Sequence, residues 1–208
     1  VADGGILKPG TDVSQFTVTD GLWKRLFAIV AADNARHTTI AANAETSWAD
    51  QKAAFRVAGV ATGTLDDLIE DAPLVLRQSE GKVIYITQAF KDALDRDIKQ
   101  NNKGSELQWE SLFDGIAKSK YNGIDIVVIP FWDEIIQGYE ATANVGQYNK
   151  PFRALFSVKD NLLAGSESEN EIADLKIWFN IDEQLNKILA KDKIGTLIAQ
   201  DDLVQVAY

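Results

Sequence analysis

Two adjacent carboxylates, Asp133 and Glu134, occupy the place in the sequence best suited to acid–base chemistry. They follow Pro130, Phe131 and Trp132 directly after an apolar segment with strand character. A glycosidase or an α/β enzyme can place its acid or nucleophile at such a strand end. The first turn of a helix explains the same two residues, because carboxylates there complement the helix dipole. A carboxylate-dependent hydrolase therefore remains an alternative function, although the chain lacks the repeated βα units of a barrel enzyme.

Other acidic residues form short groups. Glu167, Glu169 and Glu171 alternate with polar residues, but this run lacks the glycine and the aspartate spacing of a calcium loop. We expect it to be an exposed surface loop. The pairs Asp66–Asp67 and Asp201–Asp202 are typical of helix starts and turns.

Nucleophilic, metal and phosphate chemistry have little support in this chain. It has no cysteine and a single histidine, His37, which excludes thiolate clusters and a multi-histidine metal site within one chain. No serine lies in a Gly-x-Ser-x-Gly elbow. The stretch Gly59–Thr64 has only a superficial likeness to a phosphate loop, because no lysine precedes Thr64. The sequence predicts no catalytic, cofactor-binding or metal-ligating residue and no cofactor.

Five tryptophans could form a carbohydrate-binding platform. They are scattered among segments with apolar periodicity, so we expect most of them in the core or at a subunit interface. The tryptophans are at positions 23, 48, 109, 132 and 178.

Length and composition indicate an ordinary globular protein. The 208 residues correspond to one large or two small domains at about 150 residues per domain. Thirty-one acidic and 21 basic residues give a net charge of −10, which is unlike the basic surface of a duplex-binding domain. No apolar run reaches the length of a membrane-spanning helix. The chain starts at Val1 without a methionine, which suggests a processed, trimmed or incomplete N-terminus.

Capping residues and apolar spacing predict the helices. Residues 1–20 read as an extended arm, and Thr19–Asp20 can cap a helix that begins near Leu22. Residues 33–46 read as a loop. Ser47 is expected to start a helix that ends at Gly59.

A second helix is expected from Thr64, with a break near Ala72 because of Pro73. Thr87 is expected to cap a helix over Ala89–Ile98. Asp133 to Tyr139 reads as the start of another helix.

Runs of β-branched and aromatic residues predict the strands. Gly165 is expected in a turn, and residues 182–193 are ambiguous. The expected strands are Lys82–Ile86, Ile124–Ile129, Phe152–Val158, Ile172–Phe179 and Leu203–Tyr208. With helices early and strands late, the fold class is α+β.

Several of these segments, in this order, resemble the major capsid proteins of tailed bacteriophages, whose fold is shared with encapsulin-type shells. Ser47–Gln78 resembles the spine-helix region, Lys82–Leu94 the entry to the axial domain, and Tyr121–Asp133 its central strand. Asn149–Gly165, followed by Leu175–Asp182, is similar to the closing part of such subunits. The final segments Lys193–Gly195 and Asp202–Ala207 continue this pattern.

The resemblance implies a fold with a long spine helix, a peripheral sheet and an axial sheet domain. It divides the chain into an N-terminal arm with a short helix and an abbreviated extended loop, a spine-helix region, an axial-like domain and closing strands. These four segments span residues 1–46, 47–80, 81–150 and 151–208. The loop before the spine region is shorter than in similar proteins, which puts its clasp of a neighbouring subunit in doubt.

The function implied by the resemblance is structural and not enzymatic. Similar proteins self-assemble into hexamers and pentamers that enclose DNA in a virion assembled in the bacterial cytoplasm. Scaffolding and portal proteins are further candidate partners, and no membrane partner is expected. An acidic wall would contact packaged DNA weakly and non-specifically. An encapsulin-type compartment that encloses cargo enzymes is the second alternative to a phage or prophage capsid.

Overall fold

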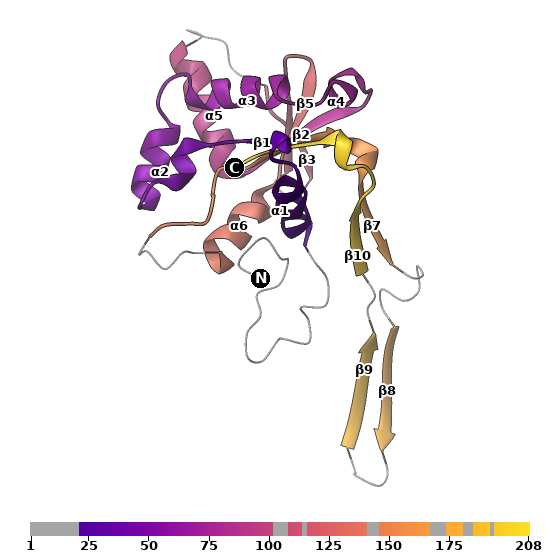
Figure 1. Ribbon diagram of the computed structural model, residues 1–208. Helices are drawn as coiled ribbons and strands as arrows, with labels where there is room; N and C mark the ends of the chain where they lie inside the picture. The colour runs from indigo at the N-terminus through magenta and orange to yellow at the C-terminus, as the bar shows by residue number, and fades with distance from the viewer. Residues whose placement is uncertain are drawn as a thin grey trace.

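The chain folds around one mixed β-sheet with helices on both faces and an arm that projects from one end (Figure 1). The α+β class predicted from the sequence is confirmed. The computed structural model describes residues 21–101, 108–113, 116–140, 146–166, 174–180, 185–191 and 194–208. None of its helices within these ranges is long and apolar enough to cross a membrane.

Six α-helices and four short 3-10 helices are present in the described residues. The α-helices are α1 (Leu22–Ala32), α2 (Trp48–Phe55), α3 (Val60–Glu70), α4 (Leu74–Gln78), α5 (Gln88–Asn101) and α6 (Pro130–Tyr139). The 3-10 helices are η2 (Asn34–Arg36), η3 (Ala41–Ala44), η4 (Lys159–Asn161) and η6 (Asp201–Leu203).

Seven strands form the central sheet in the order β1-β11-β6-β2-β5-β4-β3. The pairs β1–β11 and β2–β5 are parallel, and the other neighbours are antiparallel. The strands are β1 (His37–Thr38), β2 (Lys82–Ile86), β3 (Glu110–Phe113), β4 (Ile116–Tyr121), β5 (Ile124–Val128), β6 (Ala154–Val158) and β11 (Val204–Ala207).

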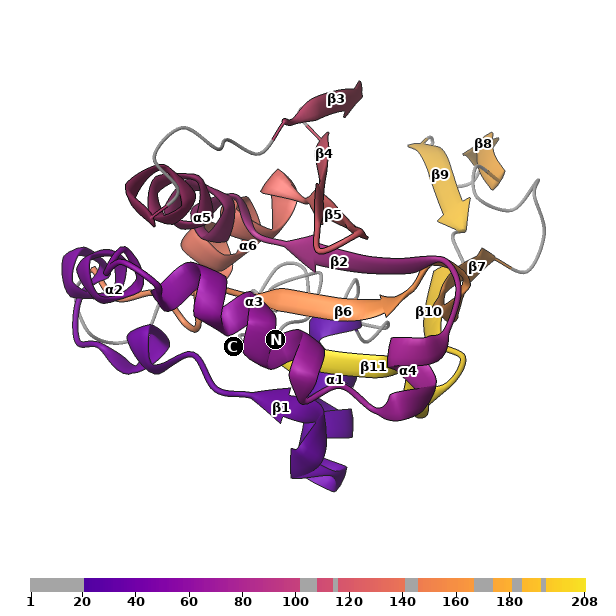
Figure 2. The same cartoon turned by 90° about the horizontal axis from the view of Figure 1, so that it is seen from above.

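Alternate side chains of the central strands enter two separate cores. Ile84 and Phe156 pack on one face with Phe55, Leu65 and other residues of the helices α2, α3 and α5. The side chains that point the other way, Tyr85 and Leu155, belong to a smaller cluster built around α1. Because both faces are covered, four of the five residues of β6 are buried. Figure 2 shows α3 lying in front of β6 and β11, and α5 beside α3.

The expected spine-helix region, residues 47–80, is three helices rather than one long helix. Gly59 takes a left-handed conformation (φ +86°) that separates α2 from α3. Pro73 separates α3 from α4, as expected from its missing N–H and fixed φ. The expected start of the second helix at Thr64 is wrong, because α3 already begins at Val60.

A buried carboxylate explains the early start of α3. Asp97 projects from α5, and its two oxygens accept hydrogen bonds from the backbone N–H groups of Gly59 (2.6 Å) and Thr62 (2.9 Å). These N–H groups would otherwise lack partners at the helix start. Asp97 lies 35 residues or more in sequence from the two N–H groups that it caps. No local sequence pattern could therefore predict this cap.

Several other expectations need correction. The expected loop over residues 33–46 contains η2, η3 and the short strand β1, which pairs with β11. Gly165, expected in a turn, lies inside a strand opposite Gly195. Helix α6 begins at Pro130, three residues before the expected start, because proline suits the first helical position. The N-cap of α1 is Gly21, without a side-chain hydrogen bond, rather than Thr19–Asp20.

The arm consists of two antiparallel ribbons of two strands each. The first ribbon pairs β7 (Leu162–Ser166) with β10 (Ile194–Ile198), and the second pairs β8 (Asp174–Asn180) with β9 (Leu185–Lys191). Neither ribbon is part of the central sheet. Figure 1 shows the second ribbon continuing away from the body beyond the first.

Candidate functional site

The two carboxylates that could support hydrolysis do not act together. The Asp133 carboxylate accepts hydrogen bonds from the backbone N–H groups of Gln88 (2.6 Å) and Ala89 (2.9 Å), and so caps α5. Burial raises the pKa of Asp133, and these backbone hydrogen bonds offset the rise only in part. Glu134 is exposed. The structure therefore favours a helix-capping role for Asp133 and gives Glu134 no shared site with it.

A pocket of about 140 Å³ lies beside this cap. Its lining includes two cations, Lys52 and Arg56, and two carboxylates, Asp92 and Asp133. The Lys52 ammonium lies 5.1 Å from the centre of the Trp48 ring, and Asp92 accepts a hydrogen bond from the Gln88 side chain (2.8 Å). With two charges of each sign, the pocket selects neither anionic nor cationic ligands by charge.

The other candidate residues also have structural roles. Within the Gly59–Thr64 stretch, the N–H groups of Gly59 and Thr62 donate to Asp97 and are therefore not free for a phosphate. His37 contacts the backbone oxygen of Tyr208 (3.2 Å) and packs on the Tyr208 ring, and burial lowers its pKa. Neither residue set forms a nucleophile–base arrangement.

The acidic groups are dispersed. Asp66 accepts a hydrogen bond from the Tyr121 hydroxyl (2.9 Å), whereas Asp67 is exposed. Asp202 pairs with Arg36, and Asp201 is exposed. Glu167, Glu169 and Glu171 lie outside the described residues. Within the described ranges, no three histidine or acidic side chains are grouped so as to hold a metal ion.

Four of the five tryptophans can be placed, and none of these four is largely exposed. Trp23 meets the ring of Trp132 edge to face at 4.9 Å, and Trp48 stacks with Phe152. Trp109 donates a hydrogen bond to Asp95 (2.8 Å). The side chain of Trp178 lies outside the described residues. These contacts support the expectation of core packing rather than a carbohydrate platform.

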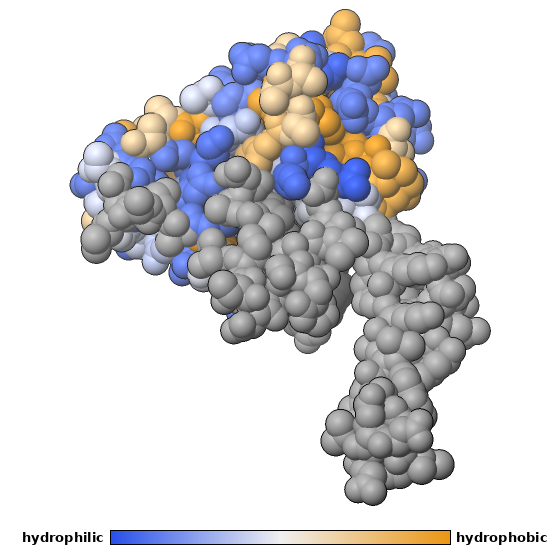
Figure 3. Space-filling view, turned by 60° about the horizontal axis from the view of Figure 1, so that its bottom comes forward, coloured by the Kyte–Doolittle hydropathy of each residue, from blue (hydrophilic) through white to orange (hydrophobic). Residues whose placement is uncertain are grey.

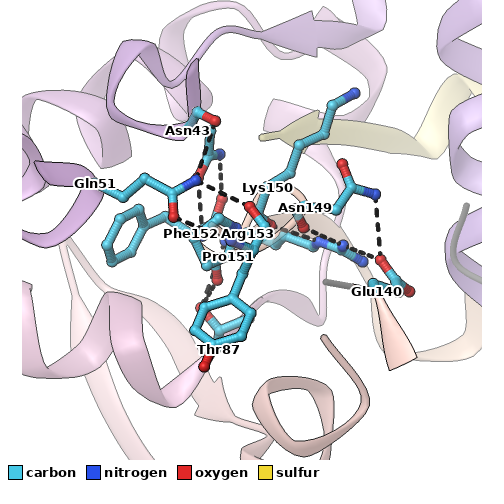
Figure 4. A network of polar contacts seen from close by, with 10 residues as sticks. Asn43, Gln51, Thr87, Glu140, Asn149, Lys150, Pro151, Phe152 and Arg153 are labelled. Carbon is cyan, nitrogen blue, oxygen red and sulfur yellow. Dashed lines mark hydrogen bonds and ion pairs between the residues drawn. The ribbon is translucent and has the colours of Figure 1, made fainter. Parts of the chain in front are cut away.

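Sequence reasoning missed a polar network that holds the segment before β6 (Figure 4). The Asn43 amide donates to the backbone oxygen of Phe152 (2.8 Å) and accepts from its N–H (3.0 Å). The Gln51 amide makes the same two contacts with Tyr148, at 2.9 Å and 3.3 Å. Two side chains thus imitate the hydrogen bonding of a neighbouring strand along this segment.

A buried ion pair lies at the end of the same segment. The Arg153 and Glu140 side chains are 0% and 1% exposed, and a guanidinium nitrogen (Nη2) donates to a Glu140 oxygen (Oε2). Arg153 also donates to the backbone oxygens of Lys150 and Asn149, each at 2.8 Å. Its guanidinium lies 4.9 Å from the Trp23 ring centre. Burial lowers the pKa of Arg153, and the Glu140 charge opposes that shift.

Exposed apolar side chains form the other feature that the sequence did not single out. Leu74 and Val75 on α4 are 64% and 60% exposed, and Leu163 and Leu197 on the first ribbon are 46% and 53% exposed. Isolated exposed apolar residues are common on protein surfaces. Here the four residues occur in two adjacent pairs, one on a helix and one across a ribbon.

No protein family matches the chain in sequence, and no curated protein matches it. Among solved structures, it is similar to a chain of the satellite phage P4 procapsid that includes the size determination (Sid) protein. That match has 10% identity and a TM-score of 0.49, and covers 99% of this chain. A chain of the holo-SrpI encapsulin complex from Synechococcus elongatus matches 83% of this chain at 12% identity, with a TM-score of 0.44.

A chain of Mycobacterium phage Che8 matches 94% of this chain at 12% identity, with a TM-score of 0.39. This chain spans 60%, 52% and 66% of the lengths of the three solved chains, respectively.

Proposed function

We propose that this chain is a structural subunit of a phage or prophage capsid shell. It self-assembles into capsomers, hexamers and pentamers, that enclose DNA in a virion. Scaffolding and portal proteins are its proposed further partners, and it carries no catalytic role. The identity of the shell rests on the resemblance of several segments to capsid proteins, namely 47–78, 82–94, 121–133, 149–165, 175–182, 193–195 and 202–207.

The projecting arm is the observation that carries this proposal. Its two ribbons have two strands each, and neither joins the central sheet. The first ribbon is covered on one face by the cluster around α1, whereas a two-stranded ribbon such as the second is marginally stable in water without a third strand or a helix to cover it. The open edges also offer unpaired backbone groups to another chain. An arm of this construction is expected to gain stability from neighbouring molecules, as it would within a shell.

Removing the second ribbon tests the proposal. Ser166 and Ile194 are opposite each other in the first ribbon, so an Asn-Gly turn in place of residues 167–193 closes it as a hairpin. We expect the wild type to form rings or closed shells in electron micrographs at high protein concentration. The shortened variant should melt at nearly the same temperature and form no shells. A wild type that stays a monomer over a range of salt and protein concentrations would contradict the proposal.

The content of recovered particles separates the two kinds of shell. Nuclease-protected DNA is expected for a capsid, whereas an enclosed enzyme would indicate an encapsulin-type compartment.

Glu134→Gln serves as a control variant in the assembly assay, because this exposed carboxylate should not affect assembly. The double variant Asp133→Asn/Glu134→Gln tests the alternative of a carboxylate-dependent hydrolase. We expect its activity on a panel of sugars to be the same as that of the wild type.

A further inference from the structure

One exposed side-chain amide stands directly before a glycine. Figure 3 shows hydrophilic and apolar residues interspersed over one face of the body, so polar side chains in contact with water are common. Asn122 and Gly123 are both exposed, and they are the single Asn-Gly pair in the 208 residues. Every other asparagine of the chain precedes a residue that has a Cβ. Asn122 is therefore the side-chain amide with the least hindered backbone nitrogen next to it.

These two residues form the turn between β4 and β5. Tyr121 pairs with Ile124 across the hairpin, so the turn has only two residues. Asn122 and Gly123 take positive φ angles of +47° and +80°, as a type I′ turn requires and as an Asn-Gly pair favours. Apart from its chain neighbours, Gly123 has no atom within 4 Å of the position that a Cβ would take. The approach to the turn is therefore open.

A single carboxylate on α3 holds the end of this hairpin. Asp66 Oδ1 accepts a hydrogen bond from the Tyr121 hydroxyl (2.9 Å) and a longer one from the Asn122 amide (3.4 Å). The contact of the amide is exposed and near the limit for a hydrogen bond, so it restrains the Asn122 side chain only weakly. Exposed turns also open locally at little cost in free energy. Such opening lets the Asn122 side chain meet the Gly123 backbone nitrogen.

We propose that Asn122 is a site of spontaneous deamidation. The Gly123 backbone nitrogen attacks Cγ of Asn122, a new C–N bond forms, and the amide nitrogen leaves as ammonia with the proton of the attacking N–H. Water, the only co-reactant, then opens the resulting cyclic imide. Cleavage between the Gly123 nitrogen and Cγ gives aspartate. Cleavage between that nitrogen and the backbone carbonyl carbon gives isoaspartate, whose backbone runs through Cβ and Cγ.

Both products disturb the contact with Asp66. Aspartate places a second carboxylate beside Asp66 Oδ1, where the amide now donates a hydrogen bond, and like charges at this distance repel. Isoaspartate also adds a carbon atom to the backbone of the turn, which then no longer matches the two-residue connection between Tyr121 and Ile124. Deamidation therefore loosens the end of the β4–β5 hairpin from α3.

Ageing of the full chain tests the proposal. The protein is incubated at mildly alkaline pH, and peptide mapping by mass spectrometry compares it with an unaged sample. We expect conversion at Asn122, whereas Asn34, which is also exposed but precedes Ala35, keeps its amide. The converted protein should melt about 2–4 °C lower than the unaged protein. Asn122→Gly is the control, because glycine also suits a positive φ, and this variant should keep its melting temperature on ageing.

The outcomes separate the modification from its effect and from the proposed shell. An amide that persists at Asn122, or conversion at Asn34 at an equal rate, overturns the proposed site. Conversion at Asn122 without a change in melting temperature supports the site and overturns the loosening of the hairpin. An equal loss in aged Asn122→Gly assigns the effect to another residue and also overturns the loosening. The reaction needs no second copy of the chain, so these results hold whether or not the protein forms shells.

Discussion

The side-chain amide of Asn43 pairs with the backbone of Phe152 in both directions, as one strand pairs with another. The two residues are 109 positions apart in the sequence. Asn43 lies in η3, and Phe152 lies two residues before the first residue of the buried strand β6. The contact therefore ties the segment that leads into the central sheet to the helices that cover it (Figure 4).

Replacing this amide should destabilise the fold. Asn43→Ala leaves the Phe152 N–H and carbonyl without partners, and we expect a loss of about 1–3 kcal/mol in the free energy of unfolding. Asn43→Asp should cost at least as much, because a carboxylate would face the Phe152 carbonyl. Urea denaturation measures both variants. Asn34→Ala, at an exposed position, is the control, and an equal effect there would contradict the specific role of Asn43.

The buried ion pair predicts non-additive mutations. Arg153→Met or Glu140→Leu alone should destabilise the protein by about 3–5 kcal/mol, because each leaves a buried partner uncompensated. The double variant Arg153→Met/Glu140→Leu should recover much of that loss, since a buried ion pair often stabilises no better than apolar residues of similar size. Denaturation of all four proteins gives the coupling energy. Simple addition of the two single effects would show that the residues act independently.

Asp133 predicts a pH dependence with a definite sign. Its pKa in the folded protein is raised by burial above the ordinary value of 3.8. The folded state then binds the proton more tightly than the unfolded state, so this group adds stability as the pH falls and loses it as the pH rises through the raised pKa. Compared with Asp133→Asn, the wild type should therefore gain relative stability between pH 7 and pH 4. A constant difference over this range would contradict the prediction.

Asp125 predicts the opposite sign. Burial alone would raise its pKa, but hydrogen bonds and charge from Lys118 and Lys159, each at 3.0 Å, lower it on balance. The ionised form therefore stabilises the fold above pH 3.8, and that contribution is lost as the pH falls through the lowered pKa. Asp125→Asn should cost at most about 1 kcal/mol at pH 7. The cost should disappear at strongly acidic pH, and thermal melts over a pH series would detect a cost that persists.

Local sequence patterns predicted those elements that depend on neighbouring residues. Lys82–Ile86 is a strand as expected, because its β-branched and aromatic residues suit a covered sheet. Ser47 accepts a hydrogen bond from the Asp50 N–H, and Thr87 accepts one from the Phe90 N–H, as predicted for helix caps. These interactions span three residues, so their spacing is visible in the sequence.

Patterns were less informative for the arm and for the strand β4. Gly165 was expected in a turn because glycine favours turns, yet it pairs with Gly195 within a ribbon. The alternating segment near Ile172–Phe179 did predict β8. Strand β4 lies next to β5 and contains Lys118 and Lys120, and its few large apolar residues offered little strand signal.

Patterns among near neighbours in the sequence predicted the fold class, the main core strands and the caps within three residues of their helices. The three-dimensional fold was needed to show which carboxylate caps which distant helix, as Asp97 does for α3 and Asp133 for α5. It also decided that Arg153 is fully buried and that Leu163 and Leu197 share an exposed face. The physical reason is range: backbone preferences and caps act between near neighbours, whereas burial and charge pairing depend on which distant segments the fold brings together.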